Sequence, residues 1–237
     1  MTVDAGNRRV AFRGDEHFYR RMGIFLALLV VAGFGFNVGG GWVSLAEFPV
    51  LIFVHATVFM LWIGLFIVQP TLIGRNNLAL HRRVGWVGVA IALLMVWLGW
   101  EASIDMMRRR SDFRDGVTLS IQMSTMVMFA LLVFTAIVLR RRSDWHRRLL
   151  LCATIILAAP AVARLMPLWL GPFTLLAILS LLVGVMAVGL AHDRRRFGRF
   201  HPAYWWGIAI LVLGTGAMIP VGLSAPVQGY VKAIEWR

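Results

Sequence analysis

Seven long apolar segments dominate this sequence and decide what the chain can fold into. Several of them exceed the roughly 18 apolar residues that indicate a membrane-spanning helix, and the mean hydropathy is +0.77. A transmembrane β-barrel is excluded because its strands are shorter and alternate in polarity. The sequence therefore predicts an all-α polytopic membrane protein with transmembrane helices over 22–38, 48–73, 82–104, 118–139, 147–166, 172–191 and 203–223.

The charged residues lie mainly between and outside these helices. We expect one bundle over 22–223, a basic N-terminal arm over 1–21 and a short tail over 224–237. The arm and the loops after the second, fourth and sixth helices hold 17 of the 24 Lys and Arg residues, but only 5 of the 11 Asp and Glu residues. The positive-inside rule then places the N-terminus in the cytoplasm and the C-terminus outside, in a bacterial inner membrane.

The net charge of +13 also bears on the partners of the chain. In a soluble protein such a charge would favour nucleic acid. Here the arginines flank apolar segments, so the partner we expect is the anionic headgroup region of the cytoplasmic leaflet, and not nucleic acid.

A short motif recurs at the cytoplasmic starts of three helices. Leu80-His81-Arg82-Arg83 precedes the third helix, Trp145-His146-Arg147-Arg148 the fifth, and Phe200-His201-Pro202 the seventh. Neutral imidazole binds haem iron through one nitrogen, and a helix bundle can present two such side chains at one depth. The motif thus favours a b-type haem held by His81 and His146, with His201 as a further candidate and with Arg82 and Arg147 near the propionates.

The same residues have a simpler explanation. His and Arg at the ends of apolar helices anchor them at the membrane interface without any cofactor. No His-Glu-x-x-His zinc motif occurs, and no separate metal site is expected.

A second polar group is expected nearer the external side. His55, Trp62 and Gln69 are spaced by seven residues and share one helix face. The alternatives are a ligand pocket or second haem at His55, with Met126 as the other ligand, or structural contacts in which His55 bonds to Gln122 or Ser124. A further pair, Glu101 with Arg164, is expected at the external ends of the third and fifth helices.

The motifs resemble those of a widespread group of uncharacterised bacterial multi-pass membrane proteins. That group shows Leu-His-Arg-Arg-Leu-Gly-Trp, later His-Lys-Arg-Leu, an Ala-Arg pair and His-Pro. The corresponding residues here are His81, His146, Ala163-Arg164 and His201-Pro202, with Val84 in place of Leu and Arg147 in place of Lys, and the histidine that the group carries in the preceding helix corresponds to His55. The resemblance implies the same multi-pass fold and no particular activity. A weaker similarity, to cytochrome b561-type proteins, fails at the fourth helix, which has no histidine.

Three functions follow as hypotheses. The first is electron transfer by a b-type haem protein. The second is a non-catalytic accessory subunit of a larger membrane complex, indicated by the small-residue stripe of Gly85, Gly88 and Ala92. The third is a small-molecule permease or lipid-handling enzyme that uses a pocket at His55.

Overall fold

The regular structure of the chain is helical throughout the part described. The computed structural model describes residues 15–41, 43–109 and 115–235. Two 3₁₀ segments, η1 (Leu45–Glu47) and η3 (Leu168–Phe173), accompany the α-helices. The α-helices are α2 (Asp15–Gly39), α3 (Val50–Gly74), α4 (Leu78–Arg109), α5 (Gly116–Val138), α6 (Ser143–Leu157), α7 (Ala159–Leu165), α8 (Thr174–Phe197), α9 (Pro202–Gly222) and α10 (Ala225–Glu235).

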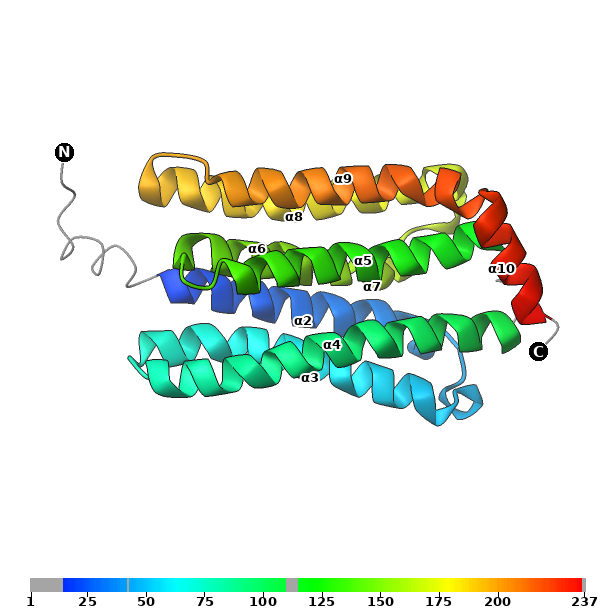
Figure 1. The fold of residues 1–237 in the computed structure, drawn as a ribbon, viewed down its shortest axis with the longest axis horizontal. Coiled ribbons are helices and arrows are strands. Elements are labelled where there is room, and N and C mark those ends of the chain that lie inside the picture. The colour runs from blue at the N-terminus through cyan, green and yellow to red at the C-terminus, as the bar shows by residue number, and fades with distance from the viewer. Residues whose placement is uncertain (1–14, 42, 110–114, 236–237) are drawn as a thin grey trace.

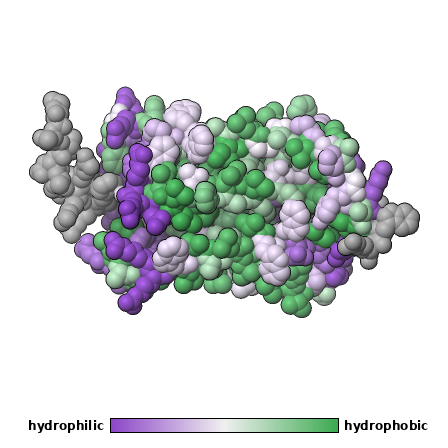
Figure 2. Space-filling model, in the orientation of Figure 1, coloured by the Kyte–Doolittle hydropathy of each residue, from purple (hydrophilic) through white to green (hydrophobic). Residues whose placement is uncertain are grey.

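Seven helical spans are long and apolar enough to cross a membrane, as the sequence predicted. Five are the single helices α2, α3, α4, α5 and α9, whereas α6 with α7 and η3 with α8 form one span each. Figure 2 shows the resulting surface, a broad apolar band between two polar ends. The predicted all-α fold, with seven helical spans long and apolar enough to cross a membrane, is thereby confirmed for the described residues.

The spans lie roughly side by side (Figure 1). The pair α8–α9 forms one edge of the bundle, α5 and α6–α7 lie in the middle, and α2 and the pair α3–α4 lie on the other side. We call the end at which α2 begins the basic end, because the arginines of the α3–α4, α5–α6 and α8–α9 connections are there. The short helix α10 runs across the opposite end.

The span made of α6 and α7 is the centre of the packing. In its most apolar stretch 67% of the residues are buried, against 17–39% in the other six spans. Among its polar groups, Thr154 accepts a hydrogen bond from the indole Nε1 of Trp62 on α3 at 3.2 Å, and Trp62 packs edge-on against Phe129 of α5. A lipid-facing helix contacts other helices on one side only, whereas this span is surrounded by other helices of the bundle.

One glycine allows α2 to touch this central span. A Cβ atom on Gly33 would lie 2.3 Å from the carbonyl oxygen of Ala161 on α7. The two backbones are therefore in direct contact at this point, and only glycine fits.

The structure differs from the predicted boundaries at both termini of the bundle. Helix α2 covers Asp15–Gly39 and so includes residues 15–21 of the expected arm, before the expected helix start at residue 22; residues 1–14 lie outside the described part. The expected tail contains α10, whose Val227 and Val231 pack against Met107, Leu119 and Met123 of α4 and α5. The prediction missed α10 because an eleven-residue amphipathic helix is much shorter than a membrane span.

Three prolines in the predicted helices do not all act alike. We expected Pro70 to kink or end its helix, but α3 continues through it to Gly74. Pro160 and Pro220 were also expected to kink their helices. Pro160 lies just after a break that divides the predicted single helix 147–166 into α6 and α7, whereas α9 continues through Pro220 to Gly222. Since proline lacks an N–H, the carbonyl four residues earlier loses its helical partner at each site.

Candidate functional site

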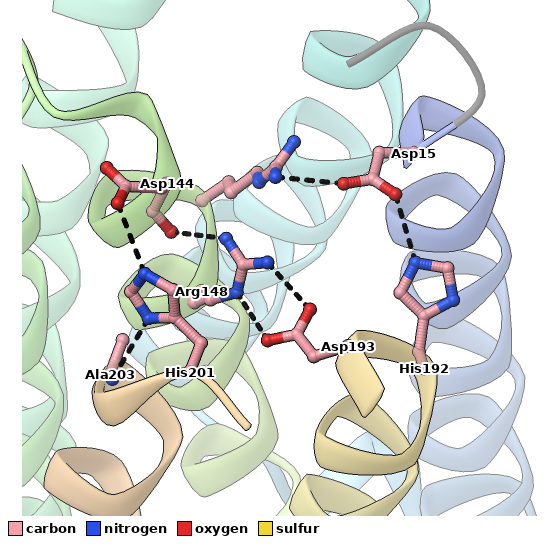
Figure 3. A network of polar contacts seen from close by, with 8 residues as sticks. Asp15, Asp144, Arg148, His192, Asp193, His201 and Ala203 are labelled. Atoms are coloured by element: carbon pink, nitrogen blue, oxygen red, sulfur yellow. Dashed lines mark hydrogen bonds and ion pairs between the residues drawn. The ribbon is translucent and has the colours of Figure 1, made fainter. Parts of the chain in front are cut away.

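The basic end carries a cluster of buried charges drawn from four helical spans. We call it the basic-end cluster (Figure 3). It links the start of α2, the start of α6, the end of α8 and the start of α9. Its members are Asp15, Asp144, Arg147, Arg148, His192, Asp193 and His201.

Arg148 and Asp193 form the centre of this cluster. The guanidinium Nε and Nη2 donate to the two carboxylate oxygens at 2.7 and 2.6 Å, which is a bidentate pair. The remaining Nη1 donates to the backbone oxygen of Asp144 at 2.7 Å. Both side chains are almost fully buried, at 2% and 1% exposure. The pair therefore holds α6 and α8 together, and the positive charge of Arg148 and the negative charge of Asp193 compensate each other.

Asp15 makes a second set of polar contacts, with the residues that directly precede Arg148 and Asp193 in the chain. Its Oδ2 lies 2.9 Å from Nη2 of Arg147, and its Oδ1 lies 3.0 Å from Nε2 of His192. Phe18 stacks on the His192 ring, with the ring centroids 3.9 Å apart. The first described turn of α2 is thereby fixed to both α6 and α8.

His201 uses both of its ring nitrogens within the protein. Its Nδ1 accepts the backbone N–H of Ala203 at 3.2 Å, which caps the N-terminus of α9. Nε2 therefore carries the proton and donates to Asp144 Oδ2 at 3.2 Å. Both nitrogens of His201, a candidate haem ligand, are thus engaged within the protein, and we do not include it among the iron ligands proposed below.

The capping role of His201 predicts a dependence of stability on pH. Burial, helped by the nearby charge of Arg148, lowers the pKa of His201 below its ordinary value near 6.5, against the opposing effect of Asp144. The neutral ring is thus favoured in the folded state, and its contribution is complete above about pH 6.5 and is lost as the pH falls below that value. Loss of an N-cap costs about 0.5–2 kcal/mol. We expect the midpoint temperature of thermal unfolding to decrease as the pH is lowered from 7 to 5.

The control for this prediction is His201→Asn, because Asn also caps helices and does not titrate. The measurement is thermal unfolding of the detergent-purified proteins across the pH range. The difference between wild type and the Asn variant isolates His201 from other titrating groups. Parallel pH profiles for the two proteins would contradict the assignment.

His81 and His146 lie in the first turns of α4 and α6, both at the basic end. His146 Nδ1 lies 2.8 Å from the carbonyl oxygen of Ala136 in the last turn of α5. That oxygen has lost its helical partner, since the N–H of Arg140 bonds to Ile137 instead. The carbonyl can only accept, so Nδ1 carries the proton and Nε2 keeps its lone pair.

The neighbourhood of His81 contains unpaired polar atoms. His81 is close enough to His146 for their charges to interact, and it also contacts the backbone of Gln69 on α3. Its Nδ1 and the Oε1 of Gln69 are buried without a hydrogen-bond partner. Buried polar atoms are usually satisfied, so these two atoms have spare hydrogen-bonding capacity.

The two arginines expected beside a cofactor differ. Arg82 is exposed next to His81. Arg147 instead pairs with Asp15 and lies over the ring of Tyr19 at 5.5 Å. His146 and Arg147 are adjacent in α6, and adjacent side chains of a helix point about 100° apart. Arg147 therefore cannot lie in the same site as His146.

The expected outer group does not assemble. His55 Nδ1 has no partner, and Gln122 instead approaches the sulfur of Met106 at 3.9 Å. The sulfur of Met126 lies against Gly99 of α4. Arg164 donates to the carbonyl of Pro160 and lies over the Phe34 ring at 4.1 Å, so the pair with Glu101 is absent among the described residues.

The hollow on α3 does not provide a pocket for His55 either. It is lined by Phe53, Thr57, Met60 and other apolar residues of α3 alone. His55 is two residues from both Phe53 and Thr57, which places it on the opposite face of the helix. Within the described ranges, no three His, Cys, Asp or Glu side chains are grouped closely enough to hold a metal ion.

Sequence reasoning missed Asp15, and it did not predict that Arg148 pairs with Asp193. The available signal was the presence of three carboxylates, Asp15, Asp144 and Asp193, among the arginines of the basic end. A carboxylate at the edge of an apolar helix usually has a partner in the bundle.

Comparisons with known proteins were made with family models, curated sequences and solved structures. No family model, no curated protein and no solved structure matches this chain. The resemblance to the bacterial membrane group therefore stays a prediction based on its motifs.

Proposed function

We propose that this chain is a b-type haem protein that transfers electrons in a bacterial inner membrane, with His81 and His146 as the iron ligands. The observation that carries the proposal is the hydrogen bond between His146 Nδ1 and the Ala136 carbonyl. Histidines that bind metals nearly always donate their other nitrogen to such a group, because this fixes the ring and the tautomer. When bound, the haem would supply a one-electron couple at this end of the bundle.

The residues present fit such a group in part. His146 offers Nε2, and His81 contributes a second imidazole from the neighbouring first turn of α4. Arg82 is the remaining candidate for the propionates, since Arg147 is held by Asp15. The chain's own contribution is to orient the His146 ring and to place both histidines at the same end.

The orientation and the lipid partner belong to the same proposal. By the positive-inside rule, the basic end faces the cytoplasm. Three of the carboxylates at that end are engaged inside the cluster, by Arg147, Arg148 and His201. Exposed arginines such as those at 140–142 are then available to anionic headgroups.

The small-residue stripe of α4 no longer supports the hypothesis of an accessory subunit. Gly85 and Gly88 lie against Gln69 and Leu65 of α3, at 3.8 Å from an added Cβ in each case. The small-residue stripe therefore serves a contact within the chain.

The test is an absorbance spectrum of the protein purified from cells supplied with haem, first oxidised and then reduced with dithionite. We expect a Soret band, and α and β bands that sharpen on reduction. His81→Ala and His146→Ala are expected to lose nearly all of the haem, because each removes an iron ligand. The matched control is His17→Ala, which changes an exposed histidine at the same end. A flat visible spectrum of the wild type, or full haem content in both variants, would refute the proposal.

A further inference from the structure

Arg164 is an arginine at the end of the bundle opposite to the basic end. It lies in the last turn of α7, at the end of the span that begins with α6 at the basic end. None of the ion pairs formed by the described residues includes it, whereas Arg147 and Arg148 of the same span are each paired with a carboxylate. A partly buried guanidinium without a counter-charge at the edge of an apolar span is costly, so it requires an explanation.

Two contacts fix the guanidinium of Arg164. Its Nη1 donates to the carbonyl oxygen of Pro160 at 2.8 Å, and its central carbon lies 4.1 Å from the centre of the Phe34 ring on α2. A guanidinium has five N–H donors, and this arrangement uses one of them. The nitrogens left over are not enclosed, because none of them is among the buried polar atoms of the described residues that lack a hydrogen bond. Spare donors of a positive charge are therefore open to a ligand from outside the chain.

The surface around Arg164 is apolar. Phe34 is 44% exposed, and nothing lies within 4 Å of a Cβ at Gly35 on the same helix. The η3 segment, which is the next element after α7, has Leu168 and Trp169 exposed by 94% and 82%. Such large apolar side chains are covered by acyl chains when the helices cross a membrane, and tryptophan prefers the level of the headgroups. The open donors of Arg164 therefore lie next to a surface that suits acyl chains.

We propose that Arg164 binds the phosphate group of a phospholipid in the leaflet at this end of the bundle. The planar guanidinium presents paired N–H donors, which match the oxygens of a phosphate. A phospholipid supplies the anion together with acyl chains that cover Phe34 and Leu168, whereas a soluble anion would leave this apolar surface in water. The site is at the other end of the bundle from the histidine pair of α4 and α6, and it does not depend on haem.

The first test uses a photoactivated lipid and the full-length protein in dodecyl maltoside micelles, which contain no phosphate. The probe is a phosphatidylglycerol analogue with a diazirine near the ester end of one acyl chain, and peptide mass spectrometry locates the label. We expect strong labelling of residues 31–36 and 164–170, and a loss of about tenfold in Arg164→Gln, because a hydrogen bond to a charged group is removed. The matched control is Arg109→Gln, which removes an exposed arginine at the same end and should leave this labelling unchanged. Equal labelling of wild type and Arg164→Gln would overturn the proposal.

The second test needs no variant and compares two probes on the wild type. A diacylglycerol analogue has the same acyl chains and diazirine but no phosphate, so we expect several-fold less labelling of the two segments. Equal labelling by the two probes would overturn the proposal, since acyl chains alone would then occupy the site. Inorganic phosphate at millimolar concentration in the buffer is expected to leave the labelling by the phosphatidylglycerol analogue unchanged. Displacement of the probe would show a site for a free anion and would overturn the assignment to a lipid.

Discussion

Replacing Asp193 with Asn is expected to lower the free energy of unfolding by about 3–5 kcal/mol, because it leaves the charge of Arg148 buried without a counter-charge. The guanidinium is 2% exposed, and two of its donors lie 2.7 and 2.6 Å from the Asp193 oxygens. An amide can accept one of these bonds but carries no charge. The loss would be measured as a shift of the unfolding transition of the detergent-purified protein.

The double variant Arg148→Met with Asp193→Leu shows whether the charge itself causes this loss. Removing both members of a buried ion pair is often neutral or stabilising, so most of the lost stability should return. Arg195→Met, which changes an exposed arginine two residues from Asp193, provides the background for loss of one positive charge. A single variant as stable as this control, or a double variant no more stable than the single one, would show that the unpaired charge of Arg148 does not cause the loss.

The second large effect is expected at Gly33→Val. A Cβ there would lie 2.3, 2.8 and 2.9 Å from the O, C and Cα atoms of Ala161, which are all backbone atoms. A flexible side chain could move aside, but these atoms move only if α2 and α7 separate. We expect a loss of at least about 1–3 kcal/mol, the usual range for overpacking, or failure to accumulate as a folded protein.

The same helix offers a matched control, Gly35→Val. Nothing lies within 4 Å of a Cβ at Gly35. The substitution is the same, and the position along α2 differs by only two residues. Thermal unfolding and the yield of monodisperse protein after size-exclusion chromatography would compare the two variants. Equal behaviour of the two would mean that α2 and α7 are not in backbone contact.

The membrane-spanning helices were predictable because each is a local property of the chain. A run of about 20 apolar residues has to bury its backbone polar groups in a helix, whichever neighbours it meets. The start of α2 was not predictable in this way. Asp15 is held in the helix by contacts with Arg147 and His192, which are far away in the sequence. The break before Pro160 could be anticipated as a kink, but not as the division between two helices.

The end of the bundle at which the site lies was predictable, but the directions in which its side chains point were not. The repeated motif placed His81, His146 and His201 at one end of the bundle, and the structure has them there. What a side chain meets depends on the rotation of its helix, which the motif does not specify. Arg147 and His201 turned to Asp15 and Asp144, whereas His146 turned to the end of α5.

The central position of α6 has a consequence for the order in which the protein assembles. During synthesis α6 enters the membrane before α8 and α9, yet its Arg148 depends on a carboxylate of α8 and shares the basic-end cluster with the start of α9. Until α8 arrives, Arg148 has to remain at the interface among headgroups, where its long side chain can reach water. Helix α6 is therefore inserted early but packs in its final position only after α8 has followed. A chain truncated before residue 193 would lack Asp193, the partner of Arg148.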